Sequence, residues 1–355
     1  MDVIILADFP ETMKTMRSNI DKELAVFLDE KVENAFDPTI RRIVELIRIF
    51  TLSGGKRLRP IFTVAGYSLF RRPDRNIYRA ALSTEISQTY FLIQDDIMDQ
   101  SLIRRGRPTF HIDVHNSLYS GAGGMQRQSE SIAIIASDLA DSYCHQVLLT
   151  SGFEPDLLVR ANLELTSIFE TTGHGQLIDV NSSSADDFRV RDLIRVHLWK
   201  TARYTIEGPL MIGAILSGTE KKVHKLSHFG YALGLAFQLH DDYLGLFGDE
   251  KTLGKSVKSD INEGKKTLLI LKAIENSSIA DADFLRETLK SGNVSDADFE
   301  RVKRIVEQSG SLDYSLSFAS KLSANAKKYM SEQEGDQDTK DFLNWLADFI
   351  IKRNQ

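Results

Sequence analysis

The sequence predicts an all-α protein, and three observations lead to this fold class. The 355-residue chain contains only seven prolines. Apolar residues recur over long stretches at the three- to four-residue spacing of amphipathic helices, whereas the alternation typical of strands is hard to find. No internal repeat and no long linker of disordered composition divides the chain. We therefore expect a single helical domain over residues 1–355.

The predicted helices begin near the N-terminus. Residues 11–50 contain two helices, separated near Asp37-Pro38 because proline cannot continue a helix interior. A glycine pair at Gly54-Gly55 interrupts the pattern before the next helix, and residues 115–128 are expected to form a loop because of their glycines. The remaining predicted helices cover residues 56–70, 76–99, 129–150, 155–181, 187–217, 220–242, 264–275, 295–308, 312–330 and 339–353.

Charge and composition exclude several classes of function. The net charge of −6 implies no broad basic surface, so we expect no nucleic-acid or anionic-membrane partner. The single cysteine, Cys144, cannot form an intramolecular disulfide and fits a small buried hydrophobe in a reducing compartment. The N-terminus lacks the basic region of a signal peptide, and no apolar run approaches the ~20 residues needed to span a bilayer. We expect a cytoplasmic protein with no transmembrane segment.

An apolar run over residues 90–93, followed by Gln94, leads into three aspartates, Asp95, Asp96 and Asp99. If the segment is helical, Asp95 and Asp99 lie one turn apart on one face, where their like charges repel unless a cation lies between them. Hard ions such as Mg²⁺ take carboxylate oxygens and often complete their coordination with substrate phosphates. The alternative is a solvated acidic turn at a helix end, and this motif alone favours neither interpretation.

A second acidic pair, Asp241-Asp242, follows another apolar helix about 140 residues later. Chance readily produces one such cluster but rarely a matched pair. Two helices that each end an apolar run with adjacent aspartates are what a metal site between facing helices would need. The pair therefore favours metal binding.

Basic residues lie near the same predicted helix ends. Arg104-Arg105 follows the first acidic cluster, Lys200-Thr201 lies in a helix, and Lys255 follows the second cluster. Arginine and lysine both suit a diphosphate, although each alone is more often a solvated surface charge. The segment from Gly54 to Arg59 adds a separate anion site, because glycines allow close backbone approach and a helix start attracts anions. Two anion sites imply two phosphorylated substrates.

Five motifs together resemble the trans-prenyltransferases of the polyprenyl diphosphate synthase family, from Gly54 to about Lys272. The stretch from Lys200 to Pro209 is similar to bacterial members more than to animal farnesyl diphosphate synthases. The matching segments are Gly54-Gly55-Lys56-Arg57-Leu58-Arg59-Pro60, Asp95-Asp96-Ile97-Met98-Asp99 with Arg104-Arg105-Gly106, Gly175-Gln176-Leu177-Ile178-Asp179, Lys200-Thr201, and Phe237-Gln238-Leu239-His240-Asp241-Asp242 with Gly254-Lys255 and Asp260.

The resemblance implies a helical bundle of the isoprenoid synthase type with a central active-site cavity, a homodimer, and three Mg²⁺ ions per site. It implies catalytic roles for Asp95, Asp99, Lys200 and Asp241. The implied metal ligands are Asp95, Asp99 and Asp241, supported by Asp96 and Asp242. The residues implied for the allylic diphosphate are Arg104, Lys200, Thr201, Gln238 and Lys255. Those implied for isopentenyl diphosphate are Lys56, Arg59, Gln88 and Arg105.

The implied reaction is ionisation of the allylic diphosphate, condensation with isopentenyl diphosphate and loss of a proton. Tyr90 and Phe91 lie five and four positions before Asp95, where the growing chain is expected to extend. Two bulky rings there predict a short product, farnesyl or geranylgeranyl diphosphate. The alternative is that both rings are ordinary core residues.

One position departs from the family pattern. The fullest second motif carries a third aspartate where this chain has Gly245. This loss leaves open a terpene cyclase, although a cyclase would not need Lys56, Arg59 and Arg105. A non-catalytic subunit of a heteromeric synthase is a third possibility, but such subunits tend to lose the aspartates that this chain keeps.

Overall fold

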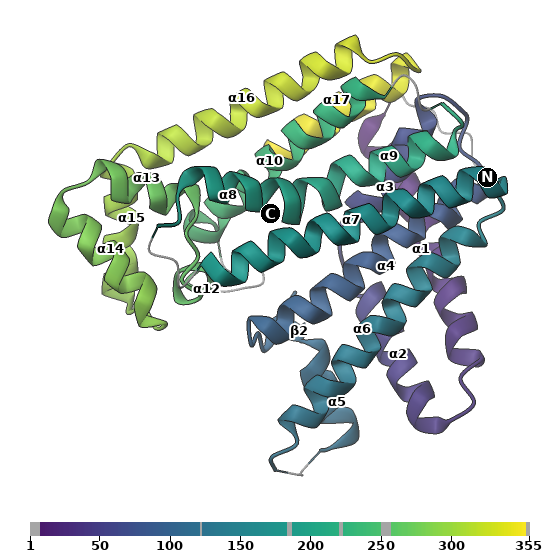
Figure 1. The fold of residues 1–355 in the computed structure, drawn as a ribbon, viewed down its shortest axis with the longest axis horizontal. Coiled ribbons are helices and arrows are strands. Elements are labelled where there is room, and N and C mark those ends of the chain that lie inside the picture. The colour runs from purple at the N-terminus through teal and green to yellow at the C-terminus, as the bar shows by residue number, and fades with distance from the viewer. Residues whose placement is uncertain (1–7, 121–122, 183–186, 220–222, 250–256, 353–355) are drawn as a thin grey trace. The chain divides into compact units, whose positions relative to one another are not determined.

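The computed structural model describes residues 8–120, 123–182, 187–219, 223–249 and 257–352. Helices dominate it (Figure 1), which confirms the predicted all-α class. The strands of the described residues are two-residue segments, β1 (Ile103–Arg104) and β2 (Arg107–Pro108), paired as an antiparallel hairpin. No helix of the described chain is long and apolar enough to cross a membrane.

The helices have the following bounds: α1 Phe9–Glu33, α2 Pro38–Leu52, α3 Leu58–Ser68, α4 Arg75–Met98, α5 Phe110–Leu118, α6 Gln126–Leu149, α7 Pro155–Ser182, α8 Val190–Val196, the π-helix η1 His197–Glu207, α9 Gly208–Leu216, α10 His224–Phe247, α12 Ser259–Asn262, α13 Leu268–Asn276, α14 Ile279–Ser291, α15 Asp296–Gln308, α16 Ser311–Glu332 and α17 Gln337–Lys352. Most predicted helices are confirmed to within a few residues. The predicted loop over 115–128 was partly wrong because α5 extends to Leu118, and the predicted helix over 187–217 is a succession of α8, η1 and α9.

Local capping explains where the N-terminal helices begin. Asp37 accepts hydrogen bonds from the backbone amides of Thr39 and Ile40, at 2.8 and 3.0 Å. Pro38 occupies the first helical position of α2, where a missing amide proton has no cost. The Asp37-Pro38 pair therefore both separates α1 from α2 and starts α2.

The structure groups into two compact units, and each contains several separate chain segments. Unit 1 comprises Met1–Leu165, Pro209–Val223 and Glu334–Phe342. Unit 2 comprises Thr166–Gly208, His224–Gln333 and Leu343–Gln355. The two aspartate motifs fall in different units. That both units form one functional domain stays a prediction.

In unit 1, small residues allow α3 and α9 to approach closely. A Cβ atom added at Gly66 would lie 2.2 Å from the carbonyl oxygen of Leu210, and one at Gly213 would lie 2.0 Å from that of Thr63. Nearby, Ile47, Ile93 and other buried side chains of α2, α4, α5 and α6 form an apolar cluster. This packing fixes the C-terminal part of α4, which carries the first aspartates.

In unit 2, glycines bring α10 against the π-helix η1. A Cβ atom at Gly230 would lie 2.5 Å from the Cα of Glu207, and one at Gly234 would lie 2.5 Å from the Cα of Ala202. The two glycines are one helical turn apart and therefore present one continuous small-residue face. This face fixes the position of η1, which carries Lys200, against the helix that carries Asp241 and Asp242.

Candidate active site

The first aspartate motif ends helix α4. The amide of Asp99 donates to the carbonyl of Asp95 at 2.8 Å, so the helical pattern continues to Asp99. Asp95 and Asp99 are half-buried, whereas Asp96 is fully buried. The one-turn spacing of the two accessible carboxylates is the predicted one. After them Gln100 takes a left-handed conformation with φ of 52°, and the chain turns into the β1–β2 hairpin.

The hairpin returns Arg104 to the aspartates. Its Nε and Nη2 atoms lie 2.7 and 2.6 Å from Asp96 Oδ1, and Nη2 lies 3.5 Å from Asp95 Oδ2. Burial raises the pKa of Asp96, and Arg104 opposes this shift. Burial alone would lower the pKa of Arg104, but its bond to Asp96 and the other aspartates together raise it. The two side chains therefore form an ion pair in which the carboxylate is buried and the guanidinium is partly exposed.

Asp96 is arranged to hold Arg104 beside Asp95. Its second oxygen, Oδ2, is buried and has no hydrogen-bond partner among the residues that the structure describes. The sequence placed Asp96 among the supporting metal residues and Arg104 at the allylic diphosphate. In the structure they contact each other, so a loss of Asp96 would also release Arg104.

The glycine-rich segment forms a tight loop before α3. Gly54 and Gly55 have φ of 72° and 91°, which explains the glycines because other residues rarely adopt such values. The Arg105 guanidinium donates to the carbonyl of Ser53 at 3.1 Å and would lie 3.3 Å from a Cβ atom at Gly55. Arg107 donates to Ser53 Oγ at 2.8 Å. The loop and the segment after Arg104 are thus held together.

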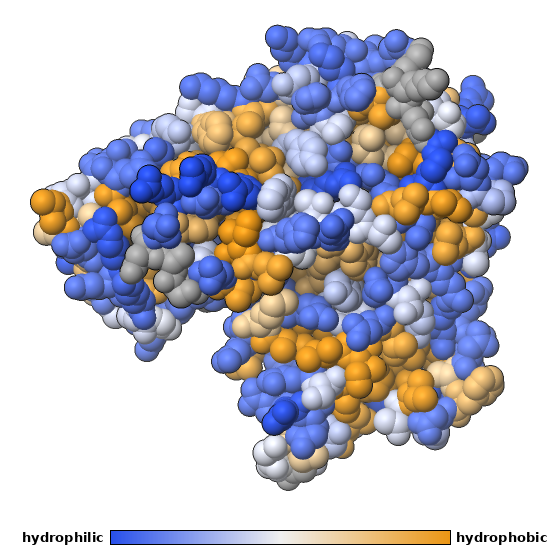
Figure 2. Space-filling model, viewed as in Figure 1, coloured by the Kyte–Doolittle hydropathy of each residue, from blue (hydrophilic) through white to orange (hydrophobic). Residues whose placement is uncertain are grey.

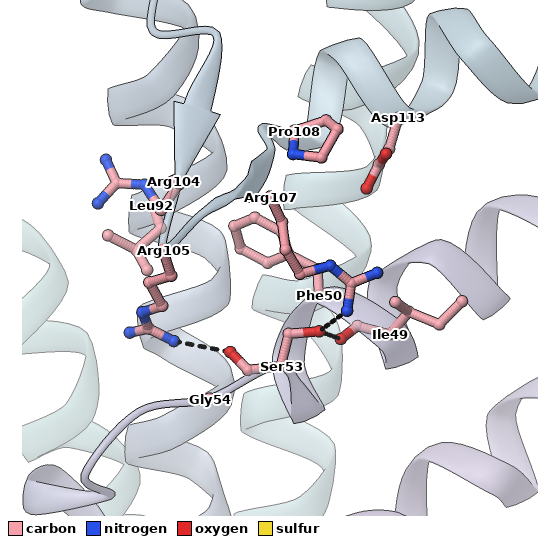
Figure 3. A pocket seen from close by; sticks show the side chains of 10 residues that line it. All are labelled: Ile49, Phe50, Ser53, Gly54, Leu92, Arg104, Arg105, Arg107, Pro108 and Asp113. Carbon is pink, nitrogen blue, oxygen red and sulfur yellow. Dashed lines mark hydrogen bonds between the residues drawn. The ribbon is translucent and has the colours of Figure 1, made fainter. Parts of the chain in front are cut away.

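A cavity of about 170 Å³ opens in unit 1 at this loop (Figure 3). Three arginines and an apolar wall line it, so it combines positive charge with hydrophobic surface. The lining residues are Ile49, Phe50, Ser53, Gly54, Leu92, Arg104, Arg105, Arg107, Pro108 and Asp113. The predicted residues Arg104 and Arg105 therefore both line this cavity, whereas Arg107 and Asp113 were not among the predicted site residues.

The remaining predicted residues of unit 1 lie close in the chain to these groups. Lys56 and Arg59, both half-buried, flank the start of α3, and Gln88 is a half-buried residue of α4. The rings of Tyr90 and Phe91 contact edge to face, with centroids 5.0 Å apart. Burial raises the pKa of Tyr90, and Asp141, Asp138 and Cys144 of α6 add to this shift.

In unit 2, both oxygens of Asp242 are hydrogen-bonded. Oδ1 accepts a bond of 2.9 Å from Gln238, and Oδ2 lies 3.1 Å from His197 Nε2. Asp242 is buried, whereas Asp241 is half-buried. Asp242 thus fixes Gln238 at this end of the motif. The sequence did not identify His197, because a single histidine in a helix carries no specific signal.

Lys200 forms an ion pair with Asp179 of α7, at 2.7 Å. A Cβ atom at Gly175 would lie 2.5 Å from the Lys200 amide nitrogen, so this glycine is required where α7 meets η1. The half-buried Thr201 follows Lys200 in η1, and π-helical segments are frequent at functional sites. Asp179 belongs to a motif that carried the resemblance, yet the sequence assigned it no role. Lys255 lies outside the described residues.

The carboxylate of Asp260 occupies the space that a side chain at Gly245 would need. A Cβ atom at Gly245 would lie 2.2 Å from Asp260 Oδ2. Asp260 is buried in the short helix α12, and its other oxygen lies 3.5 Å from Lys265. Gly245 follows Asp241 by four residues, one helical turn. A carboxylate is therefore present beside the position where the family's third aspartate would be.

The first aspartate motif ends α4 beside Arg104, and the second lies in the last two turns of α10, in the unit that also contains Lys200. Acidic motifs with cations of this kind are typical of a helical enzyme that handles diphosphates. The polyprenyl synthetase family model matches residues 40–307. The chain belongs to this family and is a prenyltransferase, which confirms the resemblance in its motifs.

Similar proteins agree with this assignment. The geranylgeranyl diphosphate synthase of Saccharolobus solfataricus is 32% identical over 86% of this chain and 89% of its own length. The geranylfarnesyl diphosphate synthase of Aeropyrum pernix is 31% identical over 85% of this chain and 91% of its own length. The crystal structure of geranylgeranyl pyrophosphate synthase from Corynebacterium glutamicum, complexed with isoprenyl diphosphate and magnesium, covers 99% of this chain and 100% of its own, at 30% identity and a TM-score of 0.89.

Proposed function

We propose that this protein is a short-chain trans-prenyl diphosphate synthase that joins an allylic diphosphate to isopentenyl diphosphate. The arrangement at the end of α4 carries the proposal. Two accessible aspartates lie one turn apart, Arg104 is held beside them, and Arg105 lies on a glycine loop suited to a second anion. A cyclase would have no use for this second site, and the relatives named as prenyl diphosphate synthases do not favour one.

The donor groups fit a divalent metal. Asp95, Asp99 and Asp241 offer carboxylate oxygens, the ligands that Mg²⁺ prefers, and all three are half-buried. A relative of 30% identity is complexed with magnesium. When bound, divalent ions would neutralise the charge that develops on a departing diphosphate. We assign three Mg²⁺ ions to the complete site.

Asp260 completes the second acidic motif in this proposal. Its carboxylate occupies the volume that a side chain at position 245 would need. It therefore supplies negative charge one helical turn from Asp241, in place of the missing third aspartate. Asp242 contributes by fixing Gln238 through its hydrogen bonds.

The chain's own cations bind and orient the two substrates. Arg104, Lys200 and Lys255, with Thr201 and Gln238, hold the allylic diphosphate, and Asp179 positions Lys200 through their ion pair. Lys56, Arg59, Gln88 and Arg105 hold isopentenyl diphosphate. Preorganised cations stabilise the charge on the leaving diphosphate, so the allylic C–O bond can ionise. The double bond of isopentenyl diphosphate attacks the resulting allylic carbocation, and a proton passes from the condensed product to the released diphosphate.

Tyr90 and Phe91 limit the length of the product in this proposal. Their edge-to-face contact makes one rigid block at one turn before Asp95. The product is farnesyl or geranylgeranyl diphosphate, and the name of the Saccharolobus relative supports the longer of the two.

The protein acts as a homodimer in this proposal, and each subunit forms one catalytic domain from both units. Apolar side chains are exposed along α6, and Figure 2 shows apolar surface over this helix. Large exposed apolar patches mark interfaces. The exposed apolar residues of α6 are Ile134, Ile135 and Leu149.

A two-substrate assay tests the function. Purified protein is incubated with Mg²⁺ and geranyl diphosphate, with and without isopentenyl diphosphate, and released diphosphate is measured. We expect release that requires both substrates and stops when a chelator removes the metal. Sustained release without isopentenyl diphosphate would contradict the proposal.

A further inference from the structure

We propose that the buried Arg57–Glu85 pair is a positioning device that presents the glycine loop and Arg105 to isopentenyl diphosphate. This inference rests on the proposed function. The sequence motifs assign no role to either residue. Arg57 lies between two predicted substrate residues, Lys56 and Arg59, and Glu85 lies ten residues before Asp95.

Arg57 is a four-way connector inside unit 1. Its side chain is 2% exposed. It bonds Asp21 of α1 at 2.7 Å, Glu85 of α4, and the carbonyls of Thr51 and Leu52 at the C-terminal end of α2, at 2.9 and 3.2 Å. The carbonyl bonds satisfy acceptors that the end of a helix leaves open. One guanidinium therefore joins the three helices around the glycine loop.

The backbone at Arg57 is held in an unfavourable conformation. Its φ is 53°, in the left-handed region that non-glycine residues rarely adopt. Among the described residues the other non-glycine residues with positive φ are Gln100 and Arg105, with φ of 52° and 53°. Such conformations persist only where the surroundings fix them, and they concentrate at functional sites. The side-chain bonds of Arg57 are the interactions that fix this one.

Arg57 and Arg105 meet across Gly55. A Cβ atom at Gly55 would lie 3.5 Å from Arg57 Nη1 and 3.3 Å from Arg105 Nη1. Two guanidinium groups this close repel each other, and Lys56 and Arg59 lie beside them in the chain. A negative charge is therefore required nearby, and Glu85 supplies it.

Glu85 is suited to balance these cations. It is 4% exposed, and its Oε1 bonds Arg57. Its Oε2 is buried and has no hydrogen-bond partner within the described part of the chain. Burial lowers the pKa of Arg105, and the charge of Glu85 is the largest effect that opposes this shift. The pair thus fixes the loop through Arg57 and keeps Arg105 close through the charge of Glu85.

Two variants test the inference. Arg57→Gly keeps a left-handed backbone accessible, removes the side-chain bonds of Arg57 and leaves the buried Glu85 carboxylate without this partner. Glu85→Gln keeps the shape and removes the charge. Small displacements of positioning groups can cost up to ~10²-fold, so we expect each variant to raise the KM for isopentenyl diphosphate by ~10-fold or more. The KM for the allylic substrate and kcat should change by less than ~3-fold. Binding of isopentenyl diphosphate measured by calorimetry should weaken in parallel.

The sign of the KM change in Glu85→Gln distinguishes a positioning role from a purely electrostatic one. If Glu85 only reduced the positive potential of the site, its removal would tighten anion binding and lower the KM. Arg71→Lys is the matched control, because Arg71 bonds the carbonyl of Ser217 at 2.6 Å in the same unit, outside the cavity lining. It should shift thermal stability without changing the KM for isopentenyl diphosphate. Arg57→Lys should restore less than half of the lost affinity for isopentenyl diphosphate, because lysine lacks the planar guanidinium that bonds several acceptors at once.

The outcomes are distinguishable. If the unaltered protein consumes no isopentenyl diphosphate, the proposed function is wrong. If it does, but both variants fold and keep its KM and calorimetric affinity for isopentenyl diphosphate, the inference about Arg57 and Glu85 is wrong. A lower KM in Glu85→Gln would also overturn it.

Discussion

The relation between Gly245 and Asp260 gives a quantitative prediction about the second acidic motif. A Cβ atom at position 245 would lie 2.2 Å from Asp260 Oδ2, whereas real Cβ atoms essentially never approach another atom closer than 3.0 Å. The two atoms must therefore move apart by at least about 0.8 Å. Overpacking of this kind costs ~1–3 kcal/mol. Replacing a helical glycine returns ~1 kcal/mol of helix propensity. The net loss of stability for Gly245→Ala is therefore at most ~2 kcal/mol, and the protein should fold.

Catalysis should be affected more than stability. Groups that support metal ligands typically contribute 10–100-fold, so Asp260→Ala should lower kcat/KM by ~10–100-fold and raise the Mg²⁺ concentration needed for half-maximal rate. Gly245→Asp should be similarly impaired, because its new carboxylate collides with that of Asp260. In the double variant the new aspartate takes the place of the one removed.

The double variant is the decisive measurement. We expect Gly245→Asp/Asp260→Ala to be more active than either single variant, with its Mg²⁺ dependence moved back toward that of the unaltered protein. Calorimetric titration with Mg²⁺ and a non-reactive diphosphate provides a readout independent of turnover. Losses that simply add in the double variant, or a normal Mg²⁺ dependence in Asp260→Ala, would refute the reasoning.

Three further predictions concern unit 1. Asp95→Ala should lower kcat by at least ~10²-fold, since it removes a proposed metal ligand. Asp29→Ala removes a partly exposed ion pair with Arg48 and should change kcat little, and equal activities of the two variants would contradict the metal role of Asp95. Tyr90→Ala with Phe91→Ala should lengthen the products separated by chromatography, and an unchanged distribution would show that the rings do not limit chain growth. Burial raises the pKa of Cys144 well above its usual value, with Asp141 adding to the shift, so the thiol should stay protonated at mildly alkaline pH. A thiol reagent should therefore label it slowly in the native protein and rapidly after unfolding, and fast native labelling would contradict the burial.

The sequence predicted the helical class and most helices because long amphipathic patterns are the strongest local signal. It missed the β1–β2 hairpin because two-residue strands leave no alternation. It missed the π-helix η1 because the altered hydrogen bonding follows from packing: Gly175, Gly230 and Gly234 let neighbouring helices approach its backbone. Such contacts between distant segments cannot be predicted from any short segment of the sequence.

The site was predictable in its residue types but not in its partnerships. The spacing of Asp95 and Asp99 and the presence of Arg104 were visible in the sequence. The ion pair of Arg104 with Asp96, and that of Lys200 with Asp179, join residues whose pairing only the fold determines. The position of the Asp260 carboxylate beside Gly245 could not be predicted for the same reason, because fifteen residues separate the two positions in the sequence.

Product analysis tests the central claim most directly. The protein is incubated with Mg²⁺, isopentenyl diphosphate and dimethylallyl, geranyl or farnesyl diphosphate, and the products are dephosphorylated and separated by chromatography against linear standards. We predict linear allylic alcohols extended by five-carbon units and ending at farnesol or geranylgeraniol. A cyclic hydrocarbon made from farnesyl diphosphate alone, with isopentenyl diphosphate left unused, would contradict the account.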